Sequence, residues 1–298
     1  MGGFFSHKSA QLIKKGINRI FKGAKWHGVE WYLTFCGAVI ILFVLFIIIF
    51  AKWIAPYDPL EFVGKPFIRP GQDGFLLGTD NLGRDVLSRI IYGSKIVMTV
   101  AVTATIFSAV VGIPIGLISG YFGGTLDRVL SLIMDSIYSF PGLILAIAMA
   151  AMLGPGMLNV SIAITVIYIP TYFRVVRGHV LSVKEELYVE AAKTLGASDL
   201  TIIARYIFPN VIASIAVIFS LNIADAILTE AGLSFLGLGI SPPNPDWGLD
   251  ISKGKVFLPT GRWWLVTYPG IMISLVALGF TLLGEGLNEI LNPRLKEA

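Results

Sequence analysis

Residues 31–51 read WYLTFCGAVIILFVLFIIIFA, a run of 21 residues without a charge between Glu30 and Lys52. As a helix, such a run spans about 30 Å, which is the thickness of the hydrocarbon core of a bilayer. A secretory signal peptide has a shorter apolar core, of about 7–15 residues, and a small-residue cleavage site. We therefore interpret this stretch as a retained first membrane helix.

The composition of the whole chain agrees with a membrane location. Of its 298 residues, 55% are hydrophobic and 14% are charged, and the mean hydropathy is +0.77. Soluble domains carry about 25% charged residues, so a water-soluble enzyme is excluded, and so is a disordered chain. A transmembrane β-barrel would alternate polar and apolar residues, whereas the apolar runs here are continuous. The fold class is an all-α membrane protein.

Five further apolar segments follow the first and predict six transmembrane helices. The third of the six carries Asp135 and is expected to kink at Pro141. An even number of spans places both termini on the same side. The predicted organisation is a basic amphipathic arm (1–31), a first helix (32–54), an external loop with a short helix (55–95), a five-helix core (96–290) that includes a long loop (182–209), and a tail (291–298).

The distribution of lysine and arginine sets the predicted orientation. Residues 1–31 carry six of the 23 basic residues, next to the first helix. Cytoplasmic loops are enriched in these residues, so both termini are expected in the cytoplasm. The arm itself is expected to lie on the lipid surface as an amphipathic helix.

The external loop contains a short amphipathic pattern between residues 84 and 91. Apolar positions alternate with polar ones at helical spacing, which predicts an interfacial helix with Asp80 as its cap. The apolar face consists of Val86, Leu87, Ile90 and Ile91, and the polar face of Arg84, Asp85, Ser88 and Arg89.

The long loop at residues 182–209 has an ordered pattern of its own. Ser182 and Glu185 form a capping box, which predicts a helix over 184–195 that ends at Gly196. A second helix, over 200–208 and capped by Ser198 or Asp199, is expected before Pro209. Such a pair of helices offers a rigid surface to another protein.

This loop resembles the EAA loop of ABC importer permeases at Glu190, Ala191, Ala192, Gly196 and Pro209. The rest of the chain is similar to the second permease of the dipeptide, oligopeptide and nickel importers. That similarity is carried by Leu77-Gly78-Thr79-Asp80, Gly83-Arg84-Asp85, Gly120-Tyr121-Phe122-Gly123-Gly124, Ser139-Phe140-Pro141-Gly142, Glu230-Ala231-Gly232-Leu233-Ser234-Phe235, and the ending Asn292-Pro293-Arg294-Leu295.

The resemblance implies a type I ABC importer permease fold in the inner or plasma membrane of a prokaryote. It implies ATP-driven import of di- or oligopeptides, with a homologous permease as heterodimer partner, two ATPase subunits and an external substrate-binding protein. Residues 190–192, Gly196 and Pro209 would then couple the chain to the ATPases. The sequence has no Gly-x-x-x-x-Gly-Lys-Ser/Thr loop, so ATP and Mg²⁺ are expected on the ATPase subunits and the chain itself is expected to be non-catalytic.

Polar residues inside the spans are candidates for the translocation pathway, because a charge in hydrocarbon is costly and usually faces protein or water. The candidates are Asp135, Asn222, Asp225 and Glu230. They could instead lie near helix ends or between subunits. We predict no metal site, no cofactor on this chain and no nucleic-acid partner, because its single cysteine and three histidines match no ligand spacing and no basic face exists outside the arm.

Three alternatives remain open at this point. The same machine could import nickel or another small solute. The chain could be an ion-coupled secondary transporter that uses Asp135, Asp225 and Glu230 as proton or cation sites. A membrane-embedded hydrolase is the weakest alternative, because no nucleophile and base stand out. Loss of transport on replacement of Glu190 or Gly196 would favour the ABC importer over the secondary transporter.

Overall fold

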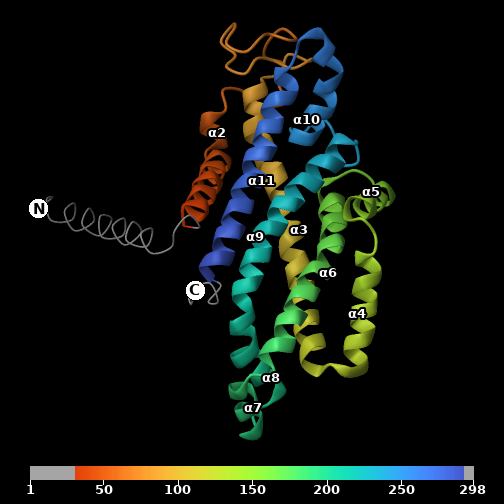
Figure 1. Cartoon of the computed structure of the whole chain (residues 1–298). Helices are drawn as coiled ribbons and strands as arrows, with labels where there is room; N and C mark the ends of the chain where they lie inside the picture. Colours follow the sequence, from red (N-terminus) through yellow and green to blue (C-terminus); the bar gives the residue numbers. More distant parts are fainter. Residues whose placement is uncertain (1–30, 292–298) are drawn as a thin grey trace, which may run out of the picture.

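The computed structural model describes residues 31–291, and its regular structure in this range is helical, without a β-strand. Long helices run side by side and short helices lie at the two ends (Figure 1). In chain order the helices are Trp31–Ile49, α2 (Ala51–Ile54), α3 (Val86–Phe122), α4 (Gly124–Tyr138), α5 (Gly142–Leu153), α6 (Met157–Val183), α7 (Leu187–Thr194), α8 (Asp199–Ile202), the π-helix η1 (Ile203–Ile207), α9 (Phe208–Phe235), α10 (Trp247–Gly254), the 3₁₀ helix η2 (Lys255–Thr260) and α11 (Trp264–Leu291).

Five of these stretches are long and apolar enough to cross a bilayer: Trp31–Ile49, α3, α6, α8 through α9, and α11. A sixth candidate is the pair α4 and α5, which are bent by 83° at the break between them. The predicted kink at Pro141 lies at this break. Pro141 precedes α5 with an extended ψ of 122° and has no N–H to continue the helix of α4. The six predicted spans are thus five continuous helices and one sharply bent pair.

The second span begins earlier than predicted. Helix α3 runs unbroken through residues 86–95, so the separate interfacial helix predicted for the external loop is wrong. Its cap is Asp85, whose Oδ2 accepts a hydrogen bond from Ser88 N at 2.7 Å, and not Asp80. The physical reason is that Arg89, expected to face water, is buried against α10 and bonded to Asp250.

The long loop begins later than predicted. Helix α6 continues to Val183, and Ser182 lies inside it. The prediction of a capping box at Ser182 and Glu185 is therefore wrong. The N-cap residue of α7 is Glu186. The extra turns of α6 are stabilised by packing, since Val176 and Val180 are fully buried one turn apart on the same face.

Helices α3 and α6 approach each other closely along a stripe of glycines. Gly112, Gly116 and Gly120 recur every four residues on the α6 side of α3. A Cβ atom added to them would lie 2.7, 2.9 and 2.8 Å from atoms of α6, including two backbone carbonyl oxygens. Small residues at this spacing allow the close backbone contact that holds membrane helices together.

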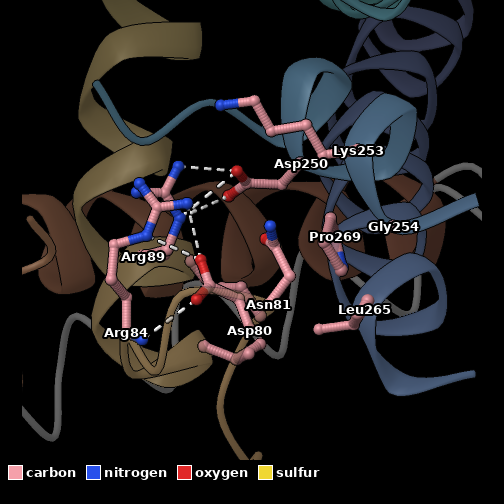
Figure 2. Close-up of a pocket in the computed structure, with 11 residues that line it drawn as sticks. Asp80, Asn81, Arg84, Arg89, Asp250, Lys253, Gly254, Leu265 and Pro269 are labelled. Atoms are coloured by element: carbon pink, nitrogen blue, oxygen red, sulfur yellow. Dashed lines mark hydrogen bonds and ion pairs between the residues drawn. The ribbon is translucent and has the colours of Figure 1, made fainter. Parts of the chain in front are cut away.

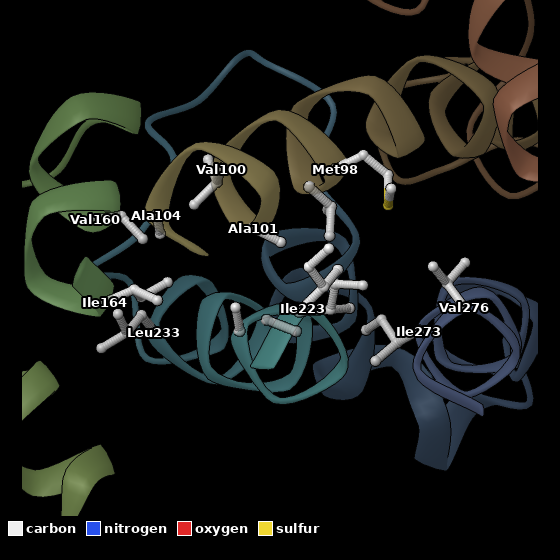
Figure 3. Close-up of a cluster of buried hydrophobic side chains, with 14 of the residues drawn as sticks. Met98, Val100, Ala101, Ala104, Val160, Ile164, Ile223, Leu233, Ile273 and Val276 are labelled. Carbon is white, nitrogen blue, oxygen red and sulfur yellow. The ribbon is translucent and has the colours of Figure 1, made fainter. Parts of the chain in front are cut away.

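The main core lies where α3, α6, α9 and α11 meet, and Figure 3 shows the side chains that fill it. These helices contribute small and branched side chains, which fits the tight spacing of the helices. The buried residues include Met98, Val100, Ala101, Ala104, Val160, Ile164, Ile223, Leu233, Ile273 and Val276.

The molecule has two distinct ends. Helices α7 and α8 lie at one end, and α10 lies at the other beside the segment 55–85 (Figure 1). We call these the α7 end and the α10 end. The predicted arm (1–31) and tail (291–298) lie outside the described residues, apart from residues 31 and 291.

Candidate functional site: an exposed hairpin and a membrane cleft

Helices α7 and α8 form a compact hairpin, residues 187–202, at the α7 end. Gly196 ends α7 in the left-handed conformation, with φ at 80°. Its N–H bonds the carbonyl of Lys193 at 3.0 Å, and Ala197 N bonds the carbonyl of Ala192 at 3.1 Å, which is the Schellman pattern. Ser198 then caps α8 by accepting from Thr201 N. The structure confirms that Gly196 ends the first helix of the loop and that Ser198 caps the second.

The inner side of the hairpin is packed onto two of the long helices. Val189, Ala192 and Ile202 are buried there. Val189 and Ile202 share a cluster with side chains from the ends of α3 and α6. In addition, Tyr121 at the end of α3 donates a hydrogen bond to Asp199 Oδ1 at 2.6 Å. The hairpin is therefore fixed to α3 and α6 by both apolar and polar contacts.

The outer side of the hairpin exposes large apolar side chains. Leu187, Leu195 and Leu200 are 81%, 87% and 77% exposed. Exposed leucines gathered on so small an element indicate a surface for protein contact. We call these three residues the leucine surface.

The predicted coupling residues occupy different environments on this hairpin. Glu190, Ala191 and Gly196 are exposed together, whereas Ala192 is buried. Pro209 lies in the first turn of α9, directly after the π-helix η1, where its fixed φ suits the start of a helix. Three of the five predicted coupling residues therefore lie at the surface. Of the other two, Ala192 packs inside the hairpin and Pro209 lies at the start of α9.

A salt bridge that the sequence did not predict joins α4 to α6 near the same end. Arg177 Nη2 lies 2.7 Å from Asp127 Oδ2, and the other carboxylate oxygen accepts from Ser119 of α3. Three helices therefore meet at one carboxylate. The partners are 50 residues apart in sequence, so no local pattern could have paired them.

A cleft of about 540 Å³ opens between the bent α4–α5 pair and helices α6 and α9. Asp225 of α9 and Tyr168 of α6 line it, and the Tyr168 hydroxyl lies 2.8 Å from Asp225 Oδ2. The same hydroxyl lies 3.2 Å from Thr229 Oγ1. The predicted pathway residue Asp225 therefore lies in a hollow inside the membrane-spanning region.

Asp135 lies on the neighbouring side of that cleft and is paired. Arg174 Nη2 is 2.9 Å from Asp135 Oδ1, and the Arg174 guanidinium stacks 4.0 Å above the ring of Tyr138, a residue of the cleft wall. Both partners of the ion pair are at least half exposed. Asp135 is thus close to the cleft, but its charge is already paired with that of Arg174.

The other two predicted pathway residues are not among the residues that line the cleft. Asn222 is buried, and Glu230 is fully buried near the α10 end. The Glu230 carboxyl group accepts from Ser234 at 2.9 Å and lies within hydrogen-bonding reach of the Asp246 carboxyl group. Asp246 caps α10 through Leu249 N at 2.8 Å, and burial raises the pKa of Asp246 above its usual value. Glu230 thus belongs to the packing between α9 and α10.

A buried polar cluster fastens the α10 end, as Figure 2 shows. Arg89 Nη2 lies 2.6 Å from Asp250 Oδ1, and the guanidinium also donates to three backbone carbonyls. Arg84 pairs with Asp80 at 2.6 Å. The sequence alone did not predict this cluster. It does contain a start signal for the helix that carries Asp250, since Asp246 stands directly before Trp247-Gly248-Leu249.

Within residues 31–291, no group of three or more His, Cys, Asp or Glu side chains is arranged to hold a metal ion. The single cysteine, Cys36, is exposed. Four aspartates of this range are paired with arginines instead.

Comparisons with known proteins agree with this architecture. Residues 112–297 match the family described as "Binding-protein-dependent transport system inner membrane component". The di/tripeptide transport system permease protein DppC of Pseudomonas aeruginosa (strain UCBPP-PA14) is 38% identical over 268 residues, 88% of each chain. The glutathione transport system permease protein GsiD of Escherichia coli O6:K15:H31 (strain 536 / UPEC) is 38% identical over 266 residues, 89% of this chain and 88% of that protein.

A solved chain of the MetNI methionine ABC transporter, from a crystal form with inward-facing conformations, has a similar fold. Its TM-score is 0.52 at 15% identity, with 66% of this chain and 93% of the solved chain covered. The fold predicted from the sequence, that of a type I ABC importer permease, is confirmed. The chain belongs to the family of binding-protein-dependent transport system inner membrane components, which are the permease subunits of ABC importers.

Proposed function

We propose that the chain is one of two homologous permeases in an ATP-driven importer of di- or oligopeptides. The second permease completes the pathway, two ATPase subunits bind ATP and Mg²⁺, and an external binding protein delivers the peptide. The support for a peptide cargo is that the relatives are named for di- and tripeptides and for glutathione, which is itself a tripeptide.

We propose further that the α7 end faces the cytoplasm of a prokaryotic cell and the α10 end faces outward. The segment 174–205 at the α7 end carries five basic residues, in agreement with the enrichment of cytoplasmic loops in lysine and arginine. Both termini are then cytoplasmic, and the α10 end is available to the binding protein.

The observation that carries the proposal is the leucine surface on a hairpin fixed to α3 and α6. When two ATPase subunits close on ATP, they would move the hairpin, and its packed inner side would move the ends of both helices. The salt bridge between Asp127 and Arg177 would extend the motion to α4. Because α4 and α6 contribute walls of the cleft, movement of the hairpin would change access to it.

A substitution on the leucine surface tests this function. In a complex reconstituted in liposomes, Leu187→Asp is expected to lower both ATPase binding and ATP-driven uptake of labelled dialanine by at least about tenfold, because a charge replaces buried apolar contact area. Leu76→Asp is the matched control, since Leu76 is also an exposed leucine but lies in the segment at the α10 end. The control should retain ATPase binding.

Two results would contradict the proposal. Uptake that survives ATP depletion but collapses with the proton gradient would indicate an ion-coupled transporter. Equal ATPase binding by the wild type and Leu187→Asp would show that the leucine surface is not the docking site. Nickel uptake in place of dialanine uptake would leave the ATP-driven machine intact and change only its cargo.

A further inference from the structure

Asp225 is a carboxylate deep inside a membrane-spanning helix. It lies ten residues before the end of α9 at Phe235 and 17 residues after the start at Phe208. At 1.5 Å per residue these separations are about 15 Å and about 25 Å, so Asp225 lies near the middle of the hydrocarbon core. Its side chain is nevertheless exposed to the cleft. Charges at this depth are costly and are characteristically associated with a partner or a functional pathway.

Asp225 differs from the paired aspartates of the described residues, because no cation neutralises it. Each ion pair between residues 31 and 291 joins an aspartate to an arginine, and Asp225 is in none of them. Arg174 is the cation held against the cleft wall, but Asp135 and the ring of Tyr138 engage it. The paired aspartates are Asp80, Asp127, Asp135 and Asp250.

The surroundings of Asp225 hold the carboxylate ready to accept a further donor. Tyr168 is buried and donates to Oδ2 at 2.8 Å, which fixes the orientation of the group. No described residue donates to Oδ1. Thr171 and Thr229 add hydroxyl groups to the same wall of the cleft. An oriented carboxylate with one free oxygen, in a hollow with hydroxyl groups, is suited to the three donors of an ammonium group.

We propose that the cleft is a binding site for the ammonium group of the transported solute, with the Asp225 carboxylate as its ligand. Tyr168 positions the carboxylate, and Thr171 and Thr229 supply neighbouring oxygen acceptors. The cleft volume of about 540 Å³ is within the range of small-molecule sites. This inference rests on the proposed import of peptides, because it assigns the free amino terminus of the peptide to one residue.

The test measures binding without the external binding protein, so that any preference between two probes comes from the membrane complex. Labelled dialanine is dialysed to equilibrium against the purified complex of both permeases and both ATPases. The comparison probe is N-propionylalanine, which has a closely similar shape but no ammonium group. We expect the wild type to prefer dialanine by at least about tenfold, the range of a hydrogen bond between charged groups.

Asp225→Asn is expected to abolish this preference, and Asp225→Glu to retain part of it. Glu285→Gln is the matched control, since it removes an exposed carboxylate from α11, away from the cleft, and should keep the full preference. ATP-driven uptake by the wild type with its binding protein is measured in parallel. Absence of that uptake overturns the proposed peptide import itself.

Three results overturn the ammonium site alone while uptake persists. The first is an Asp225→Asn complex that binds dialanine as the wild type does. The second is an equal loss of binding of both probes in that variant, which would mean that Asp225 forms an ion pair with a basic residue of the second permease. The third is a wild type with no preference between the probes.

Discussion

Aspartate–arginine pairs in this chain occur in two environments, and we expect their contributions to the stability of the protein to differ accordingly. Arg89 and Asp250 are largely buried at the α10 end, whereas Arg174 and Asp135 are at least half exposed. An exposed pair exchanges hydration for a modest attraction, while a broken buried pair leaves one charge without water or partner. Arg89 also donates to three backbone carbonyls, whereas one hydrogen bond joins Arg174 to Asp135, so burial and hydrogen bonding both favour a larger contribution from the Arg89 pair.

Arg89→Met is expected to lower the stability of the complex by about 3–5 kcal/mol, because Asp250 is left uncompensated in a buried site. Arg174→Met should change it by about 0–1 kcal/mol. Thermal unfolding of the detergent-solubilised complex measures both. The double variant Arg89→Met with Asp250→Leu should recover stability, and equal melting temperatures for the two single variants would contradict the assignment.

Asp246 should make the stability of the α10 end depend on pH. Burial raises the pKa of Asp246 above its usual 3.8, so the folded state keeps a proton that the unfolded chain has released. Stability is therefore fully present below the usual value and is lost as the pH rises through the folded pKa. We expect the melting temperature of the wild type to fall as the pH rises from about 4 through the folded pKa of Asp246.

Asp246→Asn should remove much of that dependence, since the amide still caps α10 and can donate to Glu230. It should also stabilise the protein by about 1–3 kcal/mol at about pH 8, the cost of a buried unsatisfied group. Asp58→Asn, at an exposed position, should leave the pH dependence unchanged. A variant with the wild-type pH profile would show that Asp246 is not the group that titrates.

At the scale of helices, the glycine stripe of α3 sets how closely α6 can approach. Gly116→Leu is expected to destabilise the protein by at least about 1–3 kcal/mol, because its Cβ alone would lie 2.9 Å from the carbonyl oxygen of Phe173. Gly178→Ala is the matched control in α6, where no atom lies within 4 Å of the new Cβ. The control should be neutral or stabilising, by up to about 1 kcal/mol, and equal effects of the two would exclude close packing as the cause.

The contact between α3 and the hairpin allows a test of rigid coupling. Tyr121→Phe removes the hydrogen bond to Asp199 and leaves the ring in place. We expect ATP hydrolysis to persist while the peptide taken up per ATP falls about two- to fivefold, because a bond worth about 0.5–1.5 kcal/mol no longer ties α3 to the hairpin. Tyr188→Phe, on the hairpin itself, should keep the wild-type ratio, and an unchanged ratio in both would mean that this bond carries no coupling.

Local patterns predicted those features that depend on local physics. Continuous apolar runs located the spans, Pro141 located the break, and Gly196 located the end of α7. Features that depend on distant partners were missed or misplaced. Arg89 was assigned to a water-facing surface because its partner Asp250 lies 161 residues away, and only that partner makes burial possible. Nor could the sequence separate Asp225, which faces the cleft, from Glu230, which is enclosed, since both are acids in the same apolar helix.

At the scale of the whole molecule, the first helix stands apart from the rest. Only 11% of its apolar window is buried, against 39% or more for the other single-helix spans. The region matched to the family begins at residue 112 and does not include it. Its contacts are confined to one side. A Cβ added at Gly37 would lie 2.6 Å from the carbonyl oxygen of Gly279 in α11, and Val44 is buried in the main core with Ile41 and Ile48 packed against it. The segment that follows, residues 55–60, packs on α3 instead. The carbonyl oxygen of Pro59 accepts a hydrogen bond from Arg89 Nη1.

Replacing the residues of Trp31–Ile49 by alanine and leucine, with Gly37, Ile41, Val44 and Ile48 kept, should therefore leave the core folded. We expect a stability change within about 1 kcal/mol, or about 2–4 °C in melting temperature, because this variant keeps the side chains through which the helix contacts the main core. Replacing all of α11 by an alanine–leucine helix should prevent assembly, since it removes Ile273, Val276 and Phe280 from the main core. Thermal unfolding of the solubilised complex measures the stability change, and size-exclusion chromatography measures assembly. Loss of assembly in the first-helix variant would show that the exposed side chains of this helix are also needed for assembly.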